Sequence, residues 1–320
     1  MTESEEIRAC VLSVPEVAAW PEMAGLFNHE GAEPRPDWSL PLLACRAAGG
    51  QALAAVPGAA AVACMQISII LVDDMLDDDP RGEYRRLGAG PAANLSLAFQ
   101  AAAFRVIAPG VQDAERRAAV TASLAWLGLA TALGQHWDVQ DRSDEDNYWK
   151  VVRAKSTPFY GAALHVGALL GGADARVAED LRAFGLLVGE VIQIQDDLLD
   201  AFQTPANPDW KQGRNNLAIL YALAARHRDR GRFVELLPRI DDPQSLREAQ
   251  QILIGCGAVS YCAYHLVQRY QRARQLLDAA PLADPAPMRE VLARETEPLE
   301  QLLQSVGAEL PSELLLQSAT

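Results

Sequence analysis

Apolar residues recur at helical spacing along almost the whole chain, and this pattern constrains the fold more than any other feature. Alternating apolar and polar runs bounded by turn residues, which would indicate strands, are scarce. Clusters of Pro and Gly divide the chain into about ten helical segments. None of these breaks is long or low in complexity, and no internal repeat is visible. The pattern predicts an all-α fold in which residues 1–320 form a single domain.

Composition narrows the function classes. The formal net charge of −14 opposes the basic surface that nucleic acids require, so we expect no nucleic-acid partner. The five cysteines have neither disulfide nor zinc spacing, and the acidic N-terminus does not resemble a signal peptide, so we expect a cytoplasmic protein. The most apolar run, residues 61–72, is too short to span a bilayer. We therefore read it as a buried helix and expect no transmembrane segment.

Two acidic clusters with the same DDxxD spacing each follow an apolar helical segment. They are Asp73, Asp74 and Asp77, and Asp196, Asp197 and Asp200. On a helix, residues i and i+4 share a face and residue i+1 lies beside them, so each triad can act at one point. One such cluster at a helix end is usually a solvated face, but two copies on apolar helices are stronger evidence for a site.

Facing carboxylates of this kind favour a hard divalent cation. Oxygen ligands without nearby His or Cys point to Mg²⁺, or to Mn²⁺, rather than to zinc or copper. Magnesium commonly bridges carboxylates to substrate phosphates, so the two triads suggest a diphosphate held between metal ions. Such a diphosphate is activated as a leaving group, and the apolar helices would shield the resulting carbocation from water.

Several further segments accompany the two triads in a familiar order. Arg85 and Arg86 follow the first triad, and residues 134–138 read GQHWD. Tyr148 precedes Lys155 and Ser156, residues 184–200 carry FGxxxGxxxQxxDDxxD, and residues 209–214 read DWKQGR. Over most of its length the chain therefore resembles the trans-isoprenyl diphosphate synthases, or polyprenyl synthetases.

The resemblance implies an isoprenoid synthase-type helical bundle around a central substrate cavity, which usually forms a homodimer. It implies an allylic prenyl diphosphate substrate and magnesium, bound as three ions with the diphosphate. It also assigns roles to residues: the six aspartates would be catalytic metal ligands, and six other residues would bind substrate, namely Arg85, Arg86, Lys155, Gln193, Lys211 and Arg214.

The chain departs from the family where isopentenyl diphosphate would bind. Asp37 and Trp38 stand in place of a Lys and an Arg, and Gln66 stands in place of a His, seven residues before Asp73. The family has three contacts here: the motif with that Lys and Arg, this His, and the second arginine of the pair, of which only the last, Arg86, remains. Losing two cationic contacts from a diphosphate subsite should cost several kcal/mol, because charge-assisted hydrogen bonds contribute roughly 1.5–3 kcal/mol each.

Three interpretations follow. The first is a divergent prenyl diphosphate synthase that still uses isopentenyl diphosphate, with Arg35, Arg46, Arg85 or Arg86 compensating. The second keeps the ionisation step but is a terpene synthase, or a prenyltransferase to another acceptor. The third is a non-catalytic regulatory subunit, which the two complete triads disfavour because such a subunit would not need them. We expect a prenyltransferase, and of the three interpretations we favour the first, a prenyl diphosphate synthase.

Overall fold

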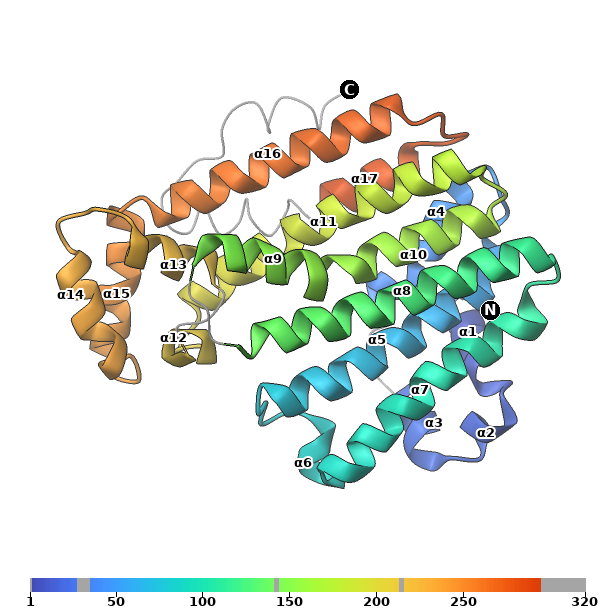
Figure 1. The fold of residues 1–320 in the computed structure, drawn as a ribbon, viewed down its shortest axis with the longest axis horizontal. Helices are drawn as coiled ribbons and strands as arrows, with labels where there is room; N and C mark the ends of the chain where they lie inside the picture. Colours follow the sequence, from blue (N-terminus) through green and yellow to red (C-terminus); the bar gives the residue numbers. More distant parts are fainter. Residues whose placement is uncertain (1, 28–34, 141–143, 213–215, 295–320) are drawn as a thin grey trace.

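The computed structural model describes residues 2–27, 35–140, 144–212 and 216–294, without the side chains at positions 211 and 212. Its long helices run side by side through the molecule (Figure 1). They are α5 (Val56–Leu76), α7 (Ala89–Gly110), α8 (Ala114–Asp138), α10 (Thr157–Leu170), α11 (Ala175–Phe202) and α16 (Ala258–Ala279). The described residues contain no strand, so the predicted all-α fold is confirmed.

Shorter helices surround the long ones. At the N-terminal side lie α1 (Glu3–Leu12), α2 (Pro15–Ala18), α3 (Pro21–Phe27), the 3-10 helix η1 (Pro36–Ser39), α4 (Leu40–Ala47) and the 3-10 helix η2 (Ala52–Ala55). The remaining elements are α6 (Glu83–Leu87), α9 (Glu145–Lys155), α12 (Pro208–Gln212), α13 (Leu217–Ala224), α14 (Arg230–Leu236), η3 (Leu237–Arg239), α15 (Pro243–Gly255) and α17 (Ala286–Arg294). Helices α12 to α15 gather at one end of the bundle (Figure 1).

Two of the Pro-Gly pairs that predict breaks between helices, Pro57-Gly58 and Pro109-Gly110, fall inside helices instead. Pro57 lies in the first turn of α5, where a missing N–H is harmless, and Pro109 lies in the last turn of α7. Gly171 and Gly172 do end α10, and Gly172 takes the left-handed conformation, with φ of 87°, that a helix terminus favours.

Helix α11 connects two buried apolar clusters. Its first half, including Phe184 and Val188, packs into the larger cluster with α5, α7 and α10. Its second half, including Val191, Ile194 and Leu198, packs into the smaller cluster with α13, α15 and α16. Because one unbroken helix belongs to both clusters, we propose that they form one domain, as the sequence suggests.

Backbone contact joins α10 and α11. A Cβ placed on Gly185 would lie 2.5 Å from the carbonyl oxygen of Tyr160, and one on Gly189 would lie 2.8 Å from the Cα of Thr157. These distances are too short for any larger side chain. The glycines of the FGxxxG stretch therefore set how closely α11 approaches α10, and so where the second acidic triad lies.

Two helices are long and apolar enough to cross a membrane, by length and composition. In the first helix, residues 52–76, 72% of the apolar 18-residue stretch is buried inside the protein. In the second, residues 114–138, 39% of that stretch is buried. The apolar run at 61–72 is part of a longer helix, so its length does not argue against a membrane span. The burial of α5 argues against one, because a buried core helix also meets these criteria of length and composition.

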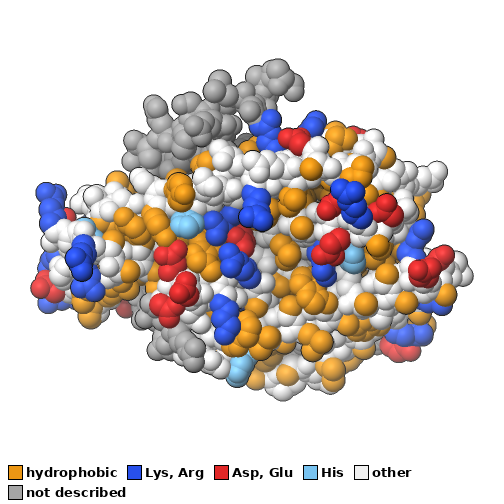
Figure 2. All heavy atoms as spheres, turned by 45° about the horizontal axis from the view of Figure 1, so that its top comes forward, with side chains coloured by type: hydrophobic (Ala, Val, Ile, Leu, Met, Phe, Trp, Pro, Cys, Tyr) orange, Lys and Arg blue, Asp and Glu red, His pale blue; other side chains and the backbone are white. Residues whose placement is uncertain are grey.

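Surface charge is mixed on the face drawn in Figure 2. There, Lys and Arg side chains lie scattered among Asp and Glu rather than in an unbroken basic band. The exclusion of a nucleic-acid partner stays a prediction. After Pro287 the sequence alternates charged residues with leucines, a pattern that predicts an amphipathic helix. This helix begins as α17, whose Met288 and Leu292 are buried against the core, and the part with Leu299, Leu302 and Leu303 lies outside the described residues.

We expect Gly185→Ala to lower the free energy of unfolding by about 1–3 kcal/mol, because the new methyl group must push α10 and α11 apart. Urea denaturation measures this loss. Gly255→Ala, at the end of α15 with no atom within 4 Å, is the matched control and should be neutral or stabilising by about 0.4–1 kcal/mol. Equal effects of the two variants would contradict the proposed contact.

Candidate active site

The two acidic triads meet at one end of the bundle. Each triad lies at the C-terminal end of its helix, α5 or α11, and both ends line a cavity of about 790 Å³. Five of the six predicted aspartates line this cavity, and Asp74 is the exception. The C-terminal end of a helix carries partial negative charge, so the helix dipoles add to the negative potential there.

The end of α5 is held by a tight backbone turn. Asp78 takes the left-handed conformation, with φ of 56°, and the N–H of Asp79 donates to the carbonyl oxygen of Asp74 at 3.0 Å. This 6→1 bond is a Schellman motif, usually built with Gly, although Asp tolerates the conformation better than most residues. The turn keeps Asp77 on the last helical turn, close to Asp73.

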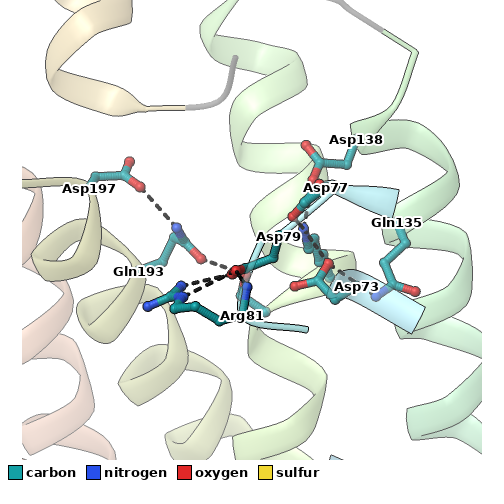
Figure 3. Close-up of polar contacts among 10 residues, drawn as sticks. Asp73, Asp77, Asp79, Arg81, Gln135, Asp138, Gln193 and Asp197 are labelled. Atoms are coloured by element: carbon teal, nitrogen blue, oxygen red, sulfur yellow. Dashed lines mark hydrogen bonds and ion pairs between the residues drawn. The ribbon is translucent and has the colours of Figure 1, made fainter. Parts of the chain in front are cut away.

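Lys155, at the end of α9, is surrounded by carboxylates. Its Nζ lies 2.8 Å from Asp73, 2.8 Å from Asp138 and 3.7 Å from Asp77. Burial lowers the pKa of Lys155, but Asp73, Asp138 and Asp77 together raise that pKa above its ordinary value. Gln135 donates to Asp73 at 3.3 Å and completes the group (Figure 3). Lys155 therefore stays charged and ties the first triad to α8 and α9.

Gly134 makes this arrangement possible. A Cβ at Gly134 would lie only 2.3 Å from the backbone nitrogen of Lys155, so the backbone of α8 touches the end of α9 directly. Asp138, one turn further along α8, then reaches the ammonium group of Lys155. The GQHWD segment thus serves to join two helices as well as to supply a carboxylate.

Asp197 differs from the other members of its triad. It is 2% exposed, and its carboxylate accepts hydrogen bonds from Tyr148 Oη at 2.7 Å, the backbone N–H of Leu217 at 2.7 Å and Gln193 Nε2 at 2.9 Å. Burial raises the pKa of Asp197 to about 8, while these donors oppose the rise. With both oxygens occupied, this side chain joins α9, α11 and α13 in the described structure.

The remaining acidic side chains are crowded. Burial raises the pKa of Asp200, and burial followed by the charge of Asp200 raises the pKa of Asp209 to about 6. Burial and the neighbouring Asp79 and Asp73 raise the pKa of Asp74. Each of these shifts means that the ionised form is disfavoured, by burial first and, at Asp74 and Asp209, by neighbouring carboxylates as well, and a bound cation would favour the ionised form.

Within the described residues, no three His, Cys, Asp or Glu side chains enclose a single metal position. The donor set nevertheless fits magnesium, which prefers oxygen ligands and keeps several waters or substrate phosphates in its shell. Asp196 and Asp200 on α11 and Asp73 and Asp77 on α5 face the cavity from two sides. Each magnesium ion would be held by one or two of these carboxylates.

The predicted substrate-binding residues fall into three groups. Lys155 and Gln193 line the cavity, and Gln193 Oε1 accepts from Ser156 at 2.6 Å. Arg85 and Arg86 are not among the lining residues: Arg85 pairs with Asp78 at 2.7 Å and Arg86 with Glu83 at 2.8 Å. The backbone of Lys211 lies in α12, but its side chain and all of Arg214 lie outside the described residues.

Sequence reasoning missed several residues of the site, among them Arg81 and Asp209. Arg81 lines the cavity between the two triads, and Asp209 lines it beside Asp200. Asp209 opens the DWKQGR segment, so the motif could have drawn attention to it. Arg81 lies in the turn after the first triad, and no spacing rule marks its place.

The chain is similar in sequence to proteins of one family. Residues 23–253 match the model of the polyprenyl synthetase family. A short chain isoprenyl diphosphate synthase of Methanothermobacter thermautotrophicus is 27% identical over 304 residues, covering 90% of this chain and 92% of that protein. A geranylfarnesyl diphosphate synthase of Aeropyrum pernix is 27% identical over 282 residues, covering 81% of this chain and 86% of that protein.

Solved structures show the same fold. The geranylgeranyl pyrophosphate synthetase of Pyrococcus horikoshii Ot3 superposes with a TM-score of 0.78 at 21% identity, covering 93% of this chain and 94% of that chain. A polyprenyl synthetase of Streptomyces coelicolor A3(2) gives 0.78 at 22% identity, covering 92% and 95%. The predicted isoprenoid synthase-type bundle is confirmed. With a family match over most of its length, the chain belongs to the polyprenyl synthetases and is an enzyme of the prenyltransferase class.

Proposed function

We propose that this enzyme uses magnesium to ionise an allylic isoprenoid diphosphate and transfers the prenyl group to a second substrate, as trans-prenyl diphosphate synthases do. The observation that carries the proposal is the cavity of about 790 Å³ with carboxylates of α5 on one side and of α11 on the other. A diphosphate can enter so acidic a space only together with cations.

The chemistry begins at the carbon–oxygen bond of the allylic diphosphate. This bond breaks with both electrons remaining on the diphosphate oxygen, and an allylic cation is left at the carbon. The π electrons of an acceptor double bond then form the new carbon–carbon bond, and a proton is lost. Magnesium, three ions by family resemblance or Mn²⁺ in its place, would stabilise the charge that develops on the leaving group.

The protein's own groups have distinct tasks in this scheme. Lys155 offers an ammonium group at the cavity wall and is positioned for the diphosphate by Asp73 and Asp138. Asp196 is exposed to the cavity and is the α11 carboxylate most accessible to a metal ion. We propose that Asp197 acts one step away, by fixing the helix that carries Asp196 and Asp200.

A homodimer and a cytoplasmic location stay predictions. Leu97 on α7 and Leu129 and Leu133 on α8 are 67%, 76% and 46% exposed. Exposed leucines on neighbouring helices are the kind of surface that a subunit contact buries, and the mass in solution is the measurement that decides.

One observation favours a second candidate, in which the acceptor carries no diphosphate. The three residues that depart from the family form a hydrogen-bonded chain: Trp38 Nε1 donates to Gln66 Oε1 at 2.7 Å, and Gln66 Nε2 donates to Asp37 at 3.3 Å. Trp38 is 9% exposed and packs on Phe27. Gln66 lies on the same face of α5 as Asp73, two turns away. The three hydrogen-bonded side chains therefore face the region beside the candidate active site.

Three of the arginines expected to compensate pair with other residues. Arg46 pairs with Glu3, Arg85 with Asp78 and Arg86 with Glu83. Burial raises the pKa of Asp37, and Arg294, Gln66 and Arg35 oppose this rise. In its ionised form Asp37 would cancel cationic charge at the place where a second diphosphate needs it.

To test the proposed function, the protein is incubated with magnesium and allylic diphosphates of ten, fifteen and twenty carbons, and released diphosphate is measured. We expect Asp196→Ala to slow release on the order of 100-fold or more, because metal-assisted stabilisation of the leaving group is lost. Asp180→Ala, on the same helix but far from the cavity, is the control and should leave the rate unchanged. No release with any substrate would support a non-catalytic subunit.

To test the acceptor, the same incubations are run with and without isopentenyl diphosphate. We expect the double variant Asp37→Lys, Gln66→His to use isopentenyl diphosphate at least tenfold better than the natural chain, because two cationic groups return to the subsite. The control Asp37→Asn removes the negative charge without adding a positive one. If the natural chain already elongates efficiently, the second candidate is rejected and the first is supported.

The crowding of carboxylates predicts a pH dependence of stability. The pKa of Asp209 in the folded protein is about 6, above its ordinary 3.8, so folding favours the protonated carboxyl group. The contribution of this protonated group to the free energy of unfolding is complete below about pH 4 and is lost as pH rises through 6. We expect the metal-free protein to lose up to about 3 kcal/mol of unfolding free energy over this range relative to Asp209→Asn. Magnesium should reduce the loss. Parallel pH profiles for the two proteins would contradict this account.

A further inference from the structure

We infer that Glu190, on α11, is a positioning residue for the proposed reaction. It holds Arg153 of α9, and through this contact it sets the rotation of α9 that directs Lys155 into the cavity. Glu190 is not among the residues that line the cavity in the described structure. The inference rests on the proposed function, because it takes the substrate diphosphate as the ligand of Lys155.

Glu190 is a buried carboxylate in the middle of α11. It is 8% exposed and lies close to the core residues Val188 and Val191. Its Oε1 accepts from Arg153 Nε at 2.9 Å, and its Oε2 accepts from Arg269 Nε at 2.5 Å. Burying a carboxylate is costly unless it is paired, and apolar residues often stabilise a fold as well as a buried ion pair does. The contribution of Glu190 is therefore to geometry more than to stability.

Arg269, on α16, fixes Glu190 from one side. Its side chain is 12% exposed, and its guanidinium carbon lies 3.8 Å from the centroid of the Trp149 ring on α9. Its Nη1 donates to the backbone carbonyl oxygen of His265 at 3.0 Å. Packed on an aromatic ring and bonded to its own helix, Arg269 has little freedom to move. Glu190 can therefore act as a fixed point for Arg153.

The geometry of α9 converts this contact into an orientation of Lys155. Each residue of an α-helix advances about 100° around the axis, so Arg153 and Lys155, two residues apart, point to nearly opposite sides. Val151 and Lys155 line the cavity, whereas Arg153 does not. The bond between Arg153 and Glu190 therefore holds the outer side of α9, and Lys155 on the inner side stays directed at the cavity.

Two further contacts lie beside Glu190 at the end of α9. A Cβ on the preceding residue, Gly189, would lie 2.8 Å from the Cα of Thr157, which follows directly on α9. One turn further along α11, Gln193 accepts from Ser156 Oγ at 2.6 Å. The end of α9 is thus held against α11 by a backbone contact between two polar ones, and a rotation of α9 would disturb all three.

This orientation matters most when the site is occupied. Lys155 is held by Asp73, Asp77 and Asp138 in the described structure. Asp73 and Asp77 are proposed metal ligands, so they are not fully available to Lys155 in the loaded enzyme. The direction of its ammonium group then depends on contacts of α9 outside the cavity, of which the bond to Glu190 is one.

The test measures binding of inorganic diphosphate with magnesium to the full chain by calorimetry. We expect Glu190→Gln to weaken binding on the order of tenfold, because a misdirected Lys155 loses its charge-assisted contact with the anion. The matched control is Glu179→Gln. Glu179 lies on the same helix and pairs with Arg182 at 2.7 Å, but it does not line the cavity, so this variant should bind as the natural chain does.

Arg153→Ala breaks the same contact from its exposed side. The side chain of Arg153 is 61% exposed, and Arg269 still pairs with Glu190 in this variant, so the inference stays testable if Glu190→Gln does not fold. We expect Arg153→Ala also to weaken binding. A long-range effect of charge would move the two variants in opposite directions, because one removes a negative and the other a positive charge. Opposite shifts would overturn the inference.

A double-mutant cycle shows whether the contact acts through Lys155. If it does, Glu190→Gln and Arg153→Ala will cause no further loss once Lys155→Ala is present. Equal losses with and without Lys155, or natural binding by Arg153→Ala, would overturn the inference while the proposed function stands. If the natural chain itself does not bind diphosphate with magnesium, the proposed function fails, and the inference fails with it.

Discussion

Helices α5 and α11 bring their carboxylate-bearing C-terminal ends to one cavity, where the helix dipoles add to the repulsion instead of opposing it. The structure manages this charge in three ways. Lys155 neutralises the first triad from within, Asp197 is buried among hydrogen-bond donors, and Arg81 stands at the rim. The charge that remains supports the proposal that the substrate arrives with divalent cations.

The positions of these groups depend on contacts between backbones as much as on the charged residues. Gly134 lets α8 touch the end of α9, and Gly185 and Gly189 let α11 lie against α10. The distance between the two acidic ends is therefore set by glycines that have no chemical role. Small changes in helix packing would alter the separation of the two triads. The size of the anion that fits between them would change as well.

Sequence predicted the fold and the two triads because helical periodicity and DDxxD spacing are local properties. It also predicted Lys155 and Gln193, which line the cavity, through their place beside matching motifs. It could not predict that Arg85 and Arg86 turn outward, because their direction follows from the left-handed residue Asp78, a conformation that Gly would have signalled but Asp does not. Arg81 was missed for the same reason. The internal hydrogen bonds of Asp197 depend on α9 and α13, which are distant in sequence.

The buried position of Asp197 has a consequence for how this family diverges. A carboxylate that accepts from Tyr148, Gln193 and the N–H of Leu217 holds three helices together, and its loss would leave those donors unpaired in a dry interior. A descendant that no longer catalysed any reaction would still be under selection to keep this aspartate, for folding alone. Asp196, one residue earlier, is exposed at the cavity wall, and it is the position whose loss would first mark a relative that has given up chemistry.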